Sequence, residues 1–215
     1  MNRTVDTLFW KWTLKFMDII LMGTLWLLTS LPIITIGASS TTLNMLMGRY
    51  VAGIKVNILK DYFHEFKKCF KKATIIWLIH LIVFLLLTLD LIYYWTGNST
   101  FDALGAAVLA TLLTLIIFEF NMVFIILSRK VHAKVKEIIS EAFDLSMTCF
   151  LQALCIAILT IGLPISAFFL MPEFLVMIPG IICYLNWQIL PKMFEKYMAK
   201  KTDREYQKKN RQNNN

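Results

Sequence analysis

Three ionisable side chains lie inside long apolar runs of this chain: Arg49, His80 and Glu119. Burying a charge at the centre of a bilayer costs about 2.5–3.5 kcal/mol or more, so such residues are candidates for function. With a rise of about 1.5 Å per helical residue, all three fall in the same half of the membrane. Either Arg49 and Glu119 form a structural ion pair, which is the preferred interpretation, or all three form a buried polar cluster that binds a proton, an ion or a polar headgroup.

No catalytic or metal-binding motif accompanies these residues. His80 has no second histidine at the spacing of an HxxxH or HExxH motif. The chain has no Walker loop, no GxGxxG and no GxSxG motif, and its four cysteines form no CxxC pair. We therefore expect no catalytic residue, no metal site and no cofactor, and we do not expect an enzyme.

The composition predicts how these residues are positioned. The chain has 215 residues, of which 58% are hydrophobic and 17% charged. Soluble domains have an apolar fraction of about 45–50%. Several apolar runs reach the roughly 20 residues that a helix needs to cross a bilayer, and they are continuous rather than alternating. The sequence therefore predicts an all-α fold, a polytopic transmembrane helical bundle in contact with the lipid bilayer.

The net charge of +8 does not indicate nucleic-acid binding. The lysines and arginines lie in the loops and the tail between the apolar runs, where the positive-inside rule and anionic lipid headgroups account for them. We expect no nucleic-acid partner.

The turn "PIITIG" at residues 32–37 decides the topology. Five apolar runs are obvious, and five spans would leave the N-terminus and its three basic residues outside the cell. If residues 38–58 return through the membrane as an inner helix covered by others, six spans result and both termini are cytoplasmic. We prefer six spans and keep five as the alternative.

The predicted boundaries follow from the apolar runs. One transmembrane domain covers residues 1–205, and residues 206–215 are predicted to be a disordered polar tail. The six predicted spans are residues 16–32, 38–58, 73–95, 103–127, 145–168 and 174–191.

Amphipathic stretches precede the first, third and fifth spans: "TLFWKWTLKF", "DYFHEFKKCFKK" and "KVKEIISEAFDL". We expect each to be an interfacial helix on the cytoplasmic side, with its apolar face in lipid and its basic face on headgroups. The middle stretch supplies the candidate interfacial or docking residues, which are Phe63, Phe66, Lys67, Lys68, Phe70, Lys71 and Lys72.

The segments "FWKWTLKFMDIILMGTLWLLTSLPIITIGASSTTLNML" and "DYFHEFKKCFKKATIIWLI" resemble the YesL-like family of bacterial integral membrane proteins. The resemblance covers the first ninety residues, and Cys69 stands where the family pattern often has Asn. It implies a multi-pass protein of the bacterial plasma membrane with an accessory role in carbohydrate uptake, next to the permease subunits of an ABC-type transporter. It implies no reaction and no site residues.

Three classes of function are compatible with these observations. The preferred one is a non-enzymatic accessory or assembly factor of a membrane transporter. A self-contained transporter of a small solute or ion, using Arg49, His80 and Glu119, is the alternative. A membrane enzyme would need paired carboxylates, and the aspartates of the chain are scattered. The sequence predicts neither the oligomeric state nor the substrate.

Overall fold

The computed structural model describes residues 3–97, 99–170 and 177–213, and these contain helices and no strand. The all-α prediction is confirmed for this part of the chain. The elements are α1 (Arg3–Ser30), the 3-10 turn η1 (Ile33–Thr35), α2 (Ile36–Val51), α3 (Ile58–Trp95), α4 (Thr100–Arg129), α5 (Val135–Thr148), α6 (Phe150–Leu170) and α7 (Ile178–Asn213).

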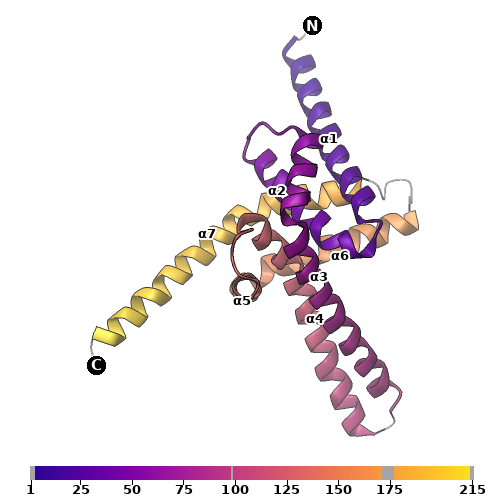
Figure 1. The fold of residues 1–215 in the computed structure, drawn as a ribbon, viewed down its shortest axis with the longest axis vertical. Helices are drawn as coiled ribbons and strands as arrows, with labels where there is room; N and C mark the ends of the chain where they lie inside the picture. The colour runs from indigo at the N-terminus through magenta and orange to yellow at the C-terminus, as the bar shows by residue number, and fades with distance from the viewer. Residues whose placement is uncertain (1–2, 98, 171–176, 214–215) are drawn as a thin grey trace.

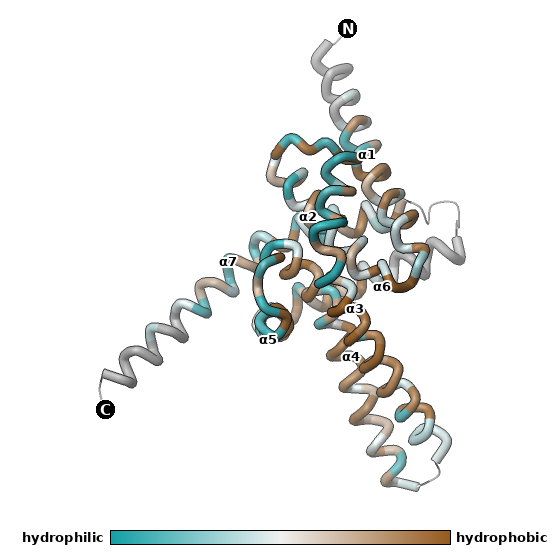
Figure 2. The backbone as a smooth tube through the Cα atoms, viewed as in Figure 1, coloured by the Kyte–Doolittle hydropathy of each residue, from teal (hydrophilic) through white to brown (hydrophobic). Residues whose placement is uncertain are grey.

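The helices form a central body from which three parts project (Figure 1). The N-terminal part of α1 and the C-terminal part of α7 extend away singly, whereas α3 and α4 extend together as a long hairpin. The half of the hairpin next to the central body is strongly apolar, and more polar residues lie toward its tip (Figure 2). Two clusters of buried apolar side chains fill the central body.

Helix α2 lies at the centre of this packing. It contacts α1, α3, α4 and α7, and its buried residues extend from Gly37 to Met47. The buried hydroxyls of Thr41 and Thr42 donate to the carbonyls four residues earlier, each at 2.8 Å. These bonds satisfy polar groups that no water reaches. The burial agrees with the expectation that other helices cover this polar segment.

The helix is shorter than the predicted span of residues 38–58. It ends at Val51, and Gly53 takes a left-handed conformation with φ of 75°. This conformation is strained for other residues and is a common way to end a helix. The side chain of Asn57 then accepts a hydrogen bond from the backbone of Lys60 at 3.3 Å and caps the start of α3.

The predicted turn at "PIITIG" is present, because the chain reverses there between α1 and α2. Trp26 donates to Ser40 at 3.1 Å, and farther from the turn Tyr50 donates to Asp18 at 3.1 Å. These pairs show that the two helices are antiparallel. Within the turn, the hydroxyl of Thr35 contacts the carbonyl of Thr29 at 2.6 Å.

Three helical segments of the described chain are long and apolar enough to cross a membrane, and a fourth results if one bent pair counts as a span. The segments are Trp12–Ser30, Ile58–Trp95 and Thr100–Arg129, and the bent pair is Val135–Thr148 with Phe150–Thr160. The two helices of that pair meet at 104°. The described helices thus provide three or four candidate spans, against the six predicted.

The difference from six has two sources. Helix α2, with its 16 residues, is shorter than the roughly 20 residues that usually cross a bilayer. The predicted span at 174–191 begins within residues 171–176, which lie outside the described part of the chain.

Two of the three amphipathic stretches are not separate helices in the structure. The first is continuous with the remainder of α1, and the middle one forms the start of α3. The third is α5, whose Ile138, Ala142 and Leu145 are fully buried in the larger core cluster. Tertiary packing against α4 and α7 therefore takes the apolar face that we expected to find in lipid.

Helix α7 continues to Asn213. The disordered tail at residues 206–215 stays a prediction. Lysine, arginine, glutamate and glutamine are good helix formers. A helix already started by packed residues can extend into such a segment at little cost.

Candidate functional site

Arg49 lies in the last turn of α2, and its partner is Glu65 rather than Glu119. Its Nη2 atom is 2.6 Å from Oε1 of Glu65. The Glu65 side chain is only 5% exposed, whereas that of Arg49 is 41% exposed. The prediction that Arg49 pairs with Glu119 is wrong. The connection between α2 and α3 is short, so the first turns of α3 lie beside the end of α2.

The spacing of apolar residues in α3 indicates that Glu65 is buried, which the sequence analysis did not recognise. Tyr62, Cys69, Ala73 and Ile76 are fully buried and recur at helical spacing. Glu65 lies on this same stripe, three residues after Tyr62. A carboxylate on the apolar face of a helix indicates a buried partner, whereas the sequence analysis predicts an interfacial helix with this face in lipid.

His80 and Glu119 lie at a second place. His80 is buried, and its Nδ1 atom is 2.9 Å from the carbonyl oxygen of Ile76. Its ring is 6.0 Å from that of Phe120 on α4, and Glu119 is close enough to interact with it electrostatically. In the described residues, Oε1 of Glu119 is buried without a hydrogen-bond partner. The three predicted site residues are thus divided between a partly buried ion pair of Arg49 with Glu65 and a second site that contains the buried His80 and the half-buried Glu119.

The seven docking candidates at the start of α3 have different environments. Phe63, Phe70, Lys67, Lys68 and Lys71 are exposed. Phe66 packs inward and stacks on Tyr62, with their ring centroids 6.3 Å apart.

Lys72 has a structural role instead. Its Nζ atom donates to the carbonyls of Val131 and Ala133, which lie between α4 and α5. A charged donor satisfies carbonyls that follow the end of α4. Lys72 therefore binds the loop between α4 and α5.

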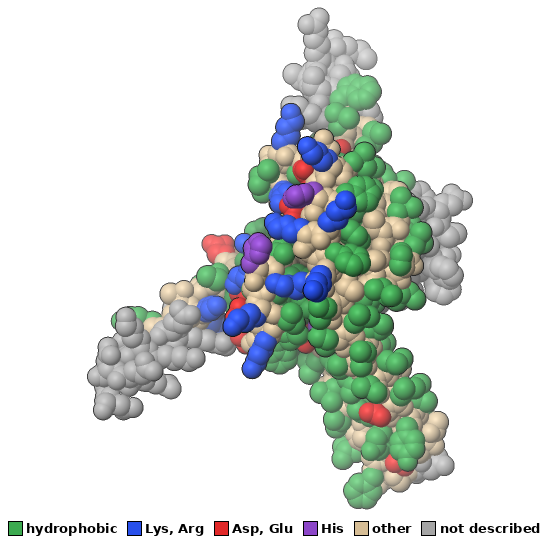
Figure 3. Space-filling view, in the orientation of Figure 1, with side chains coloured by type: hydrophobic (Ala, Val, Ile, Leu, Met, Phe, Trp, Pro, Cys, Tyr) green, Lys and Arg blue, Asp and Glu red, His purple; other side chains and the backbone are tan. Residues whose placement is uncertain are grey.

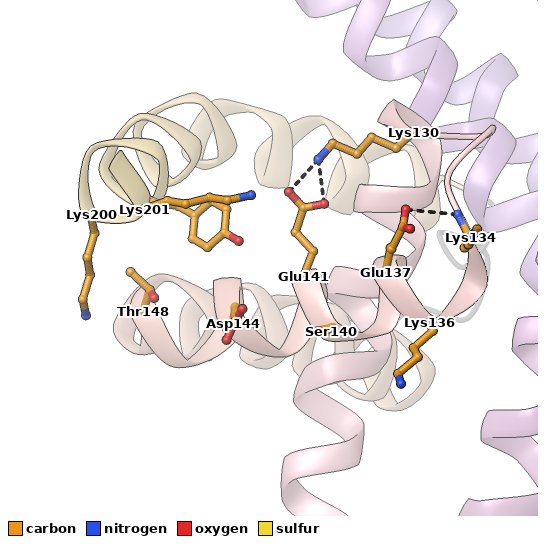
Figure 4. Close-up of a pocket in the computed structure, with 11 residues that line it drawn as sticks. Lys130, Lys134, Lys136, Glu137, Ser140, Glu141, Asp144, Thr148, Lys200 and Lys201 are labelled. Carbon is orange, nitrogen blue, oxygen red and sulfur yellow. Dashed lines mark hydrogen bonds and ion pairs between the residues drawn. The ribbon is translucent and has the colours of Figure 1, made fainter. Parts of the chain in front are cut away.

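Basic side chains gather on the central body, whereas the visible face of the α3–α4 hairpin is almost entirely apolar (Figure 3). Part of this charge lines a groove of about 710 Å³ between α5 and α7. In the groove, Nζ of Lys130 is 2.7 Å from both carboxylate oxygens of Glu141 (Figure 4). Lysines and carboxylates alternate there, so the groove is a polar surface of mixed sign.

The arrangement defines a class of protein: an α-helical protein whose long apolar helices are compatible with a place in a membrane. A family model described as "Protein of unknown function, DUF624" matches residues 19–91. This segment covers the C-terminal part of α1, all of α2 and most of α3, so it contains Arg49 and Glu65 but not Glu119. The searches of curated proteins and of solved structures find no match.

Proposed function

We propose that the chain is a multi-pass protein of the bacterial plasma membrane that serves as a non-enzymatic accessory or assembly factor of a carbohydrate-uptake transporter of the ABC type. Its partners in this proposal are the permease subunits of that transporter. The proposal includes membership of the YesL-like family, six spans and cytoplasmic termini.

The α3–α4 hairpin carries the proposal. Only 11% of the most apolar window of α3 is buried within the chain. Large apolar side chains such as Ile82, Leu85 and Leu89 are more than half exposed along it. In a bilayer these faces contact either lipid or the helices of another protein. A hairpin that its own chain leaves so open provides a long surface for partner helices.

The partner class is supported by the resemblance rather than by the geometry. The DUF624 match at residues 19–91 coincides with the segment on which the YesL-like resemblance depends. That resemblance implies a place beside sugar importers.

The topology is supported by the charge distribution. The turn "PIITIG" has no charge, and the basic residues of the α2–α3 and α4–α5 connections lie on the central body with those of α7. The positive-inside rule favours a cytoplasmic location for this charge. In the six-span proposal, α2 crosses as an inner helix, covered by α1, α3, α4 and α7.

The test is a purification of the tagged full chain in mild detergent, followed by mass spectrometry of the copurifying proteins. We expect permease subunits of a sugar importer at near-stoichiometric amounts. The comparison is with a variant in which Ile82, Leu85 and Leu89 are each replaced by alanine. This change removes apolar surface from the proposed contact while retaining a helical sequence. A chain that purifies alone under conditions that preserve known membrane complexes would contradict the proposal.

A self-contained transporter is the second candidate, and the buried His80 and Glu119 favour it. Ionisable groups at membrane depth mark ion or proton pathways in many transporters. The candidate predicts solute uptake by proteoliposomes that contain only this chain, with loss of uptake in Glu119→Gln. The accessory proposal predicts no uptake by such vesicles.

A further inference from the structure

A second groove lies where α2, α3, α4 and α7 meet. Its volume is about 420 Å³, which is within the range of small-ligand sites. Arg49, Glu65, Lys68, Arg129, His132 and Trp187 are among the residues that line it. We refer to it as the Arg129 groove.

The charge of the Arg129 groove favours an anion. Three cationic side chains, from α2, α3 and α4, face one carboxylate. Arg129 is held in place by the ring of Phe194, whose centroid is 4.1 Å from its guanidinium carbon. Arg49 is held by Glu65. Guanidinium and ammonium groups that converge from separate helices bind phosphate through charge-assisted hydrogen bonds.

Glu65 indicates, independently of the cationic residues, that a ligand in the groove would also carry a hydrogen-bond donor. The residue is 4% exposed, and its Oε2 atom has no hydrogen-bond partner in the described residues. Lys68 forms an ion pair with this oxygen at 3.8 Å, a distance that is too long for a hydrogen bond. A buried carboxylate oxygen without a donor is costly. A ligand that brings a hydroxyl group beside its anionic group would supply that donor.

The inner wall of the groove is rigid. An added Cβ atom on Gly48 would lie 2.5 Å from the Trp187 ring, so these residues are in close contact. The indole of Trp187 donates to Oδ1 of Asn44 at 3.2 Å. Asn44 lines the groove and also a mainly apolar cavity of about 310 Å³. A polar headgroup in the groove would thus lie next to apolar space suited to hydrocarbon.

We propose that the Arg129 groove binds a phosphate ester that carries a neighbouring hydroxyl group, with the phosphate at Lys68 and Arg129 and the hydroxyl at Oε2 of Glu65. Two sources have this chemistry: the headgroup of phosphatidylglycerol and a free polyol phosphate such as glycerol phosphate. The inference concerns a binding site and does not depend on the accessory role.

The test measures binding to the purified full chain. One arm titrates glycerol phosphate in detergent, with glycerol and inorganic phosphate as the ligand controls. The other arm uses native mass spectrometry with phosphatidylglycerol and with phosphatidylcholine. Lys68→Gln is the test variant, and Lys71→Gln is its matched control, because Lys71 is exposed on the same helix and does not line the groove.

We expect Lys68→Gln to weaken binding about tenfold, the loss expected for a charge-assisted hydrogen bond, while Lys71→Gln changes it less than twofold. Such a difference with glycerol phosphate supports the site with a soluble ligand. The same difference only with phosphatidylglycerol supports it with a lipid ligand. Binding to neither compound, or equal losses in the two variants, overturns the proposal.

Both variants change exposed side chains, so thermal unfolding should be unaltered and serves as the folding control. Glu65→Gln provides a second readout. It retains an acceptor for Arg49 but can place an amide donor where the free oxygen lies. We expect it to reduce the preference for glycerol phosphate over inorganic phosphate, and an unchanged preference would overturn the assignment of the hydroxyl to Glu65.

Discussion

At the scale of single residues, the ion pair of Arg49 and Glu65 joins the end of α2 to the first turns of α3. One oxygen of the buried Glu65 is bonded to Arg49 at 2.6 Å, and the other has no hydrogen-bond partner. Removing one member of a buried pair leaves the other uncompensated, which is more costly than the pair itself is stabilising. The contact therefore fixes how the end of α2 lies on α3.

A double-mutant cycle tests this pairing. We expect Arg49→Gln and Glu65→Gln to be coupled by about 1–3 kcal/mol in the free energy of unfolding, because the two residues are in direct contact. Arg49→Gln and Glu119→Gln should be additive within about 0.5 kcal/mol. Coupling only in the second cycle would restore the pair expected from the sequence and contradict the structure.

Of the three ionisable residues that the sequence singled out, His80 is buried, whereas Arg49 and Glu119 are partly exposed. Arg49, His80 and Glu119 were identified because charges are rare in apolar runs. Pairing requires the relative rotation of three helices, which spacing along one helix does not contain. Depth alone therefore suggested Glu119 for Arg49, whereas the short α2–α3 connection brings Glu65 to it.

At the scale of elements, close approach determines how α2 is packed. An added Cβ atom on Gly37 would lie 2.6 Å from both the carbonyl oxygen of Ala73 and the Cβ of Trp77. Small residues allow two helix backbones to come this near, and in a membrane such packing drives association. Gly37 thus fixes the distance between α2 and α3.

Gly37→Ala should lower stability by about 1–3 kcal/mol, since overpacking outweighs the gain in helix propensity. The control is Gly162→Ala in α6, where nothing lies within 4 Å of the added atom. Thermal unfolding in detergent, followed by circular dichroism, measures both. If Gly37→Ala is as stable as Gly162→Ala, the contact between α2 and α3 is looser than described.

Long apolar helices were predicted well and amphipathic ones poorly. The apolar runs at 73–95 and 103–127 correspond to the apolar parts of α3 and α4, because twenty continuous apolar residues leave few alternatives to a helix. An amphipathic stretch such as α5 only shows that one face is apolar. Lipid and a protein core satisfy that face equally well, so its burial against α4 and α7 could not be read from the pattern.

At the scale of the whole molecule, charge and apolar surface are divided between the central body and the hairpin. The basic groups gather on the central body, and the hairpin of α3 and α4 presents an almost unbroken apolar surface (Figure 3). Large exposed apolar patches usually mark contact with a membrane or with another protein. This division agrees with a body at the cytoplasmic interface and a hairpin in hydrocarbon.

Cysteine labelling from each side of the membrane tests the proposed topology. Ile34 lies in the turn between α1 and α2 and is 56% exposed. In a chain with its native cysteines replaced, Ile34→Cys should react with an impermeant reagent from outside intact cells, whereas Lys60→Cys should react only after permeabilisation. The opposite result would place the termini outside and contradict the six-span arrangement.

The central claim is that the hairpin contacts partner helices, and site-specific photocrosslinking in the native membrane tests it most directly. A photoreactive residue at Leu85, which is 58% exposed in α3, should crosslink to a permease subunit of a sugar importer. The same residue at Tyr206, exposed in α7, is the control and should not. Crosslinks from Leu85 to lipid alone, with no protein adduct, would contradict the accessory role.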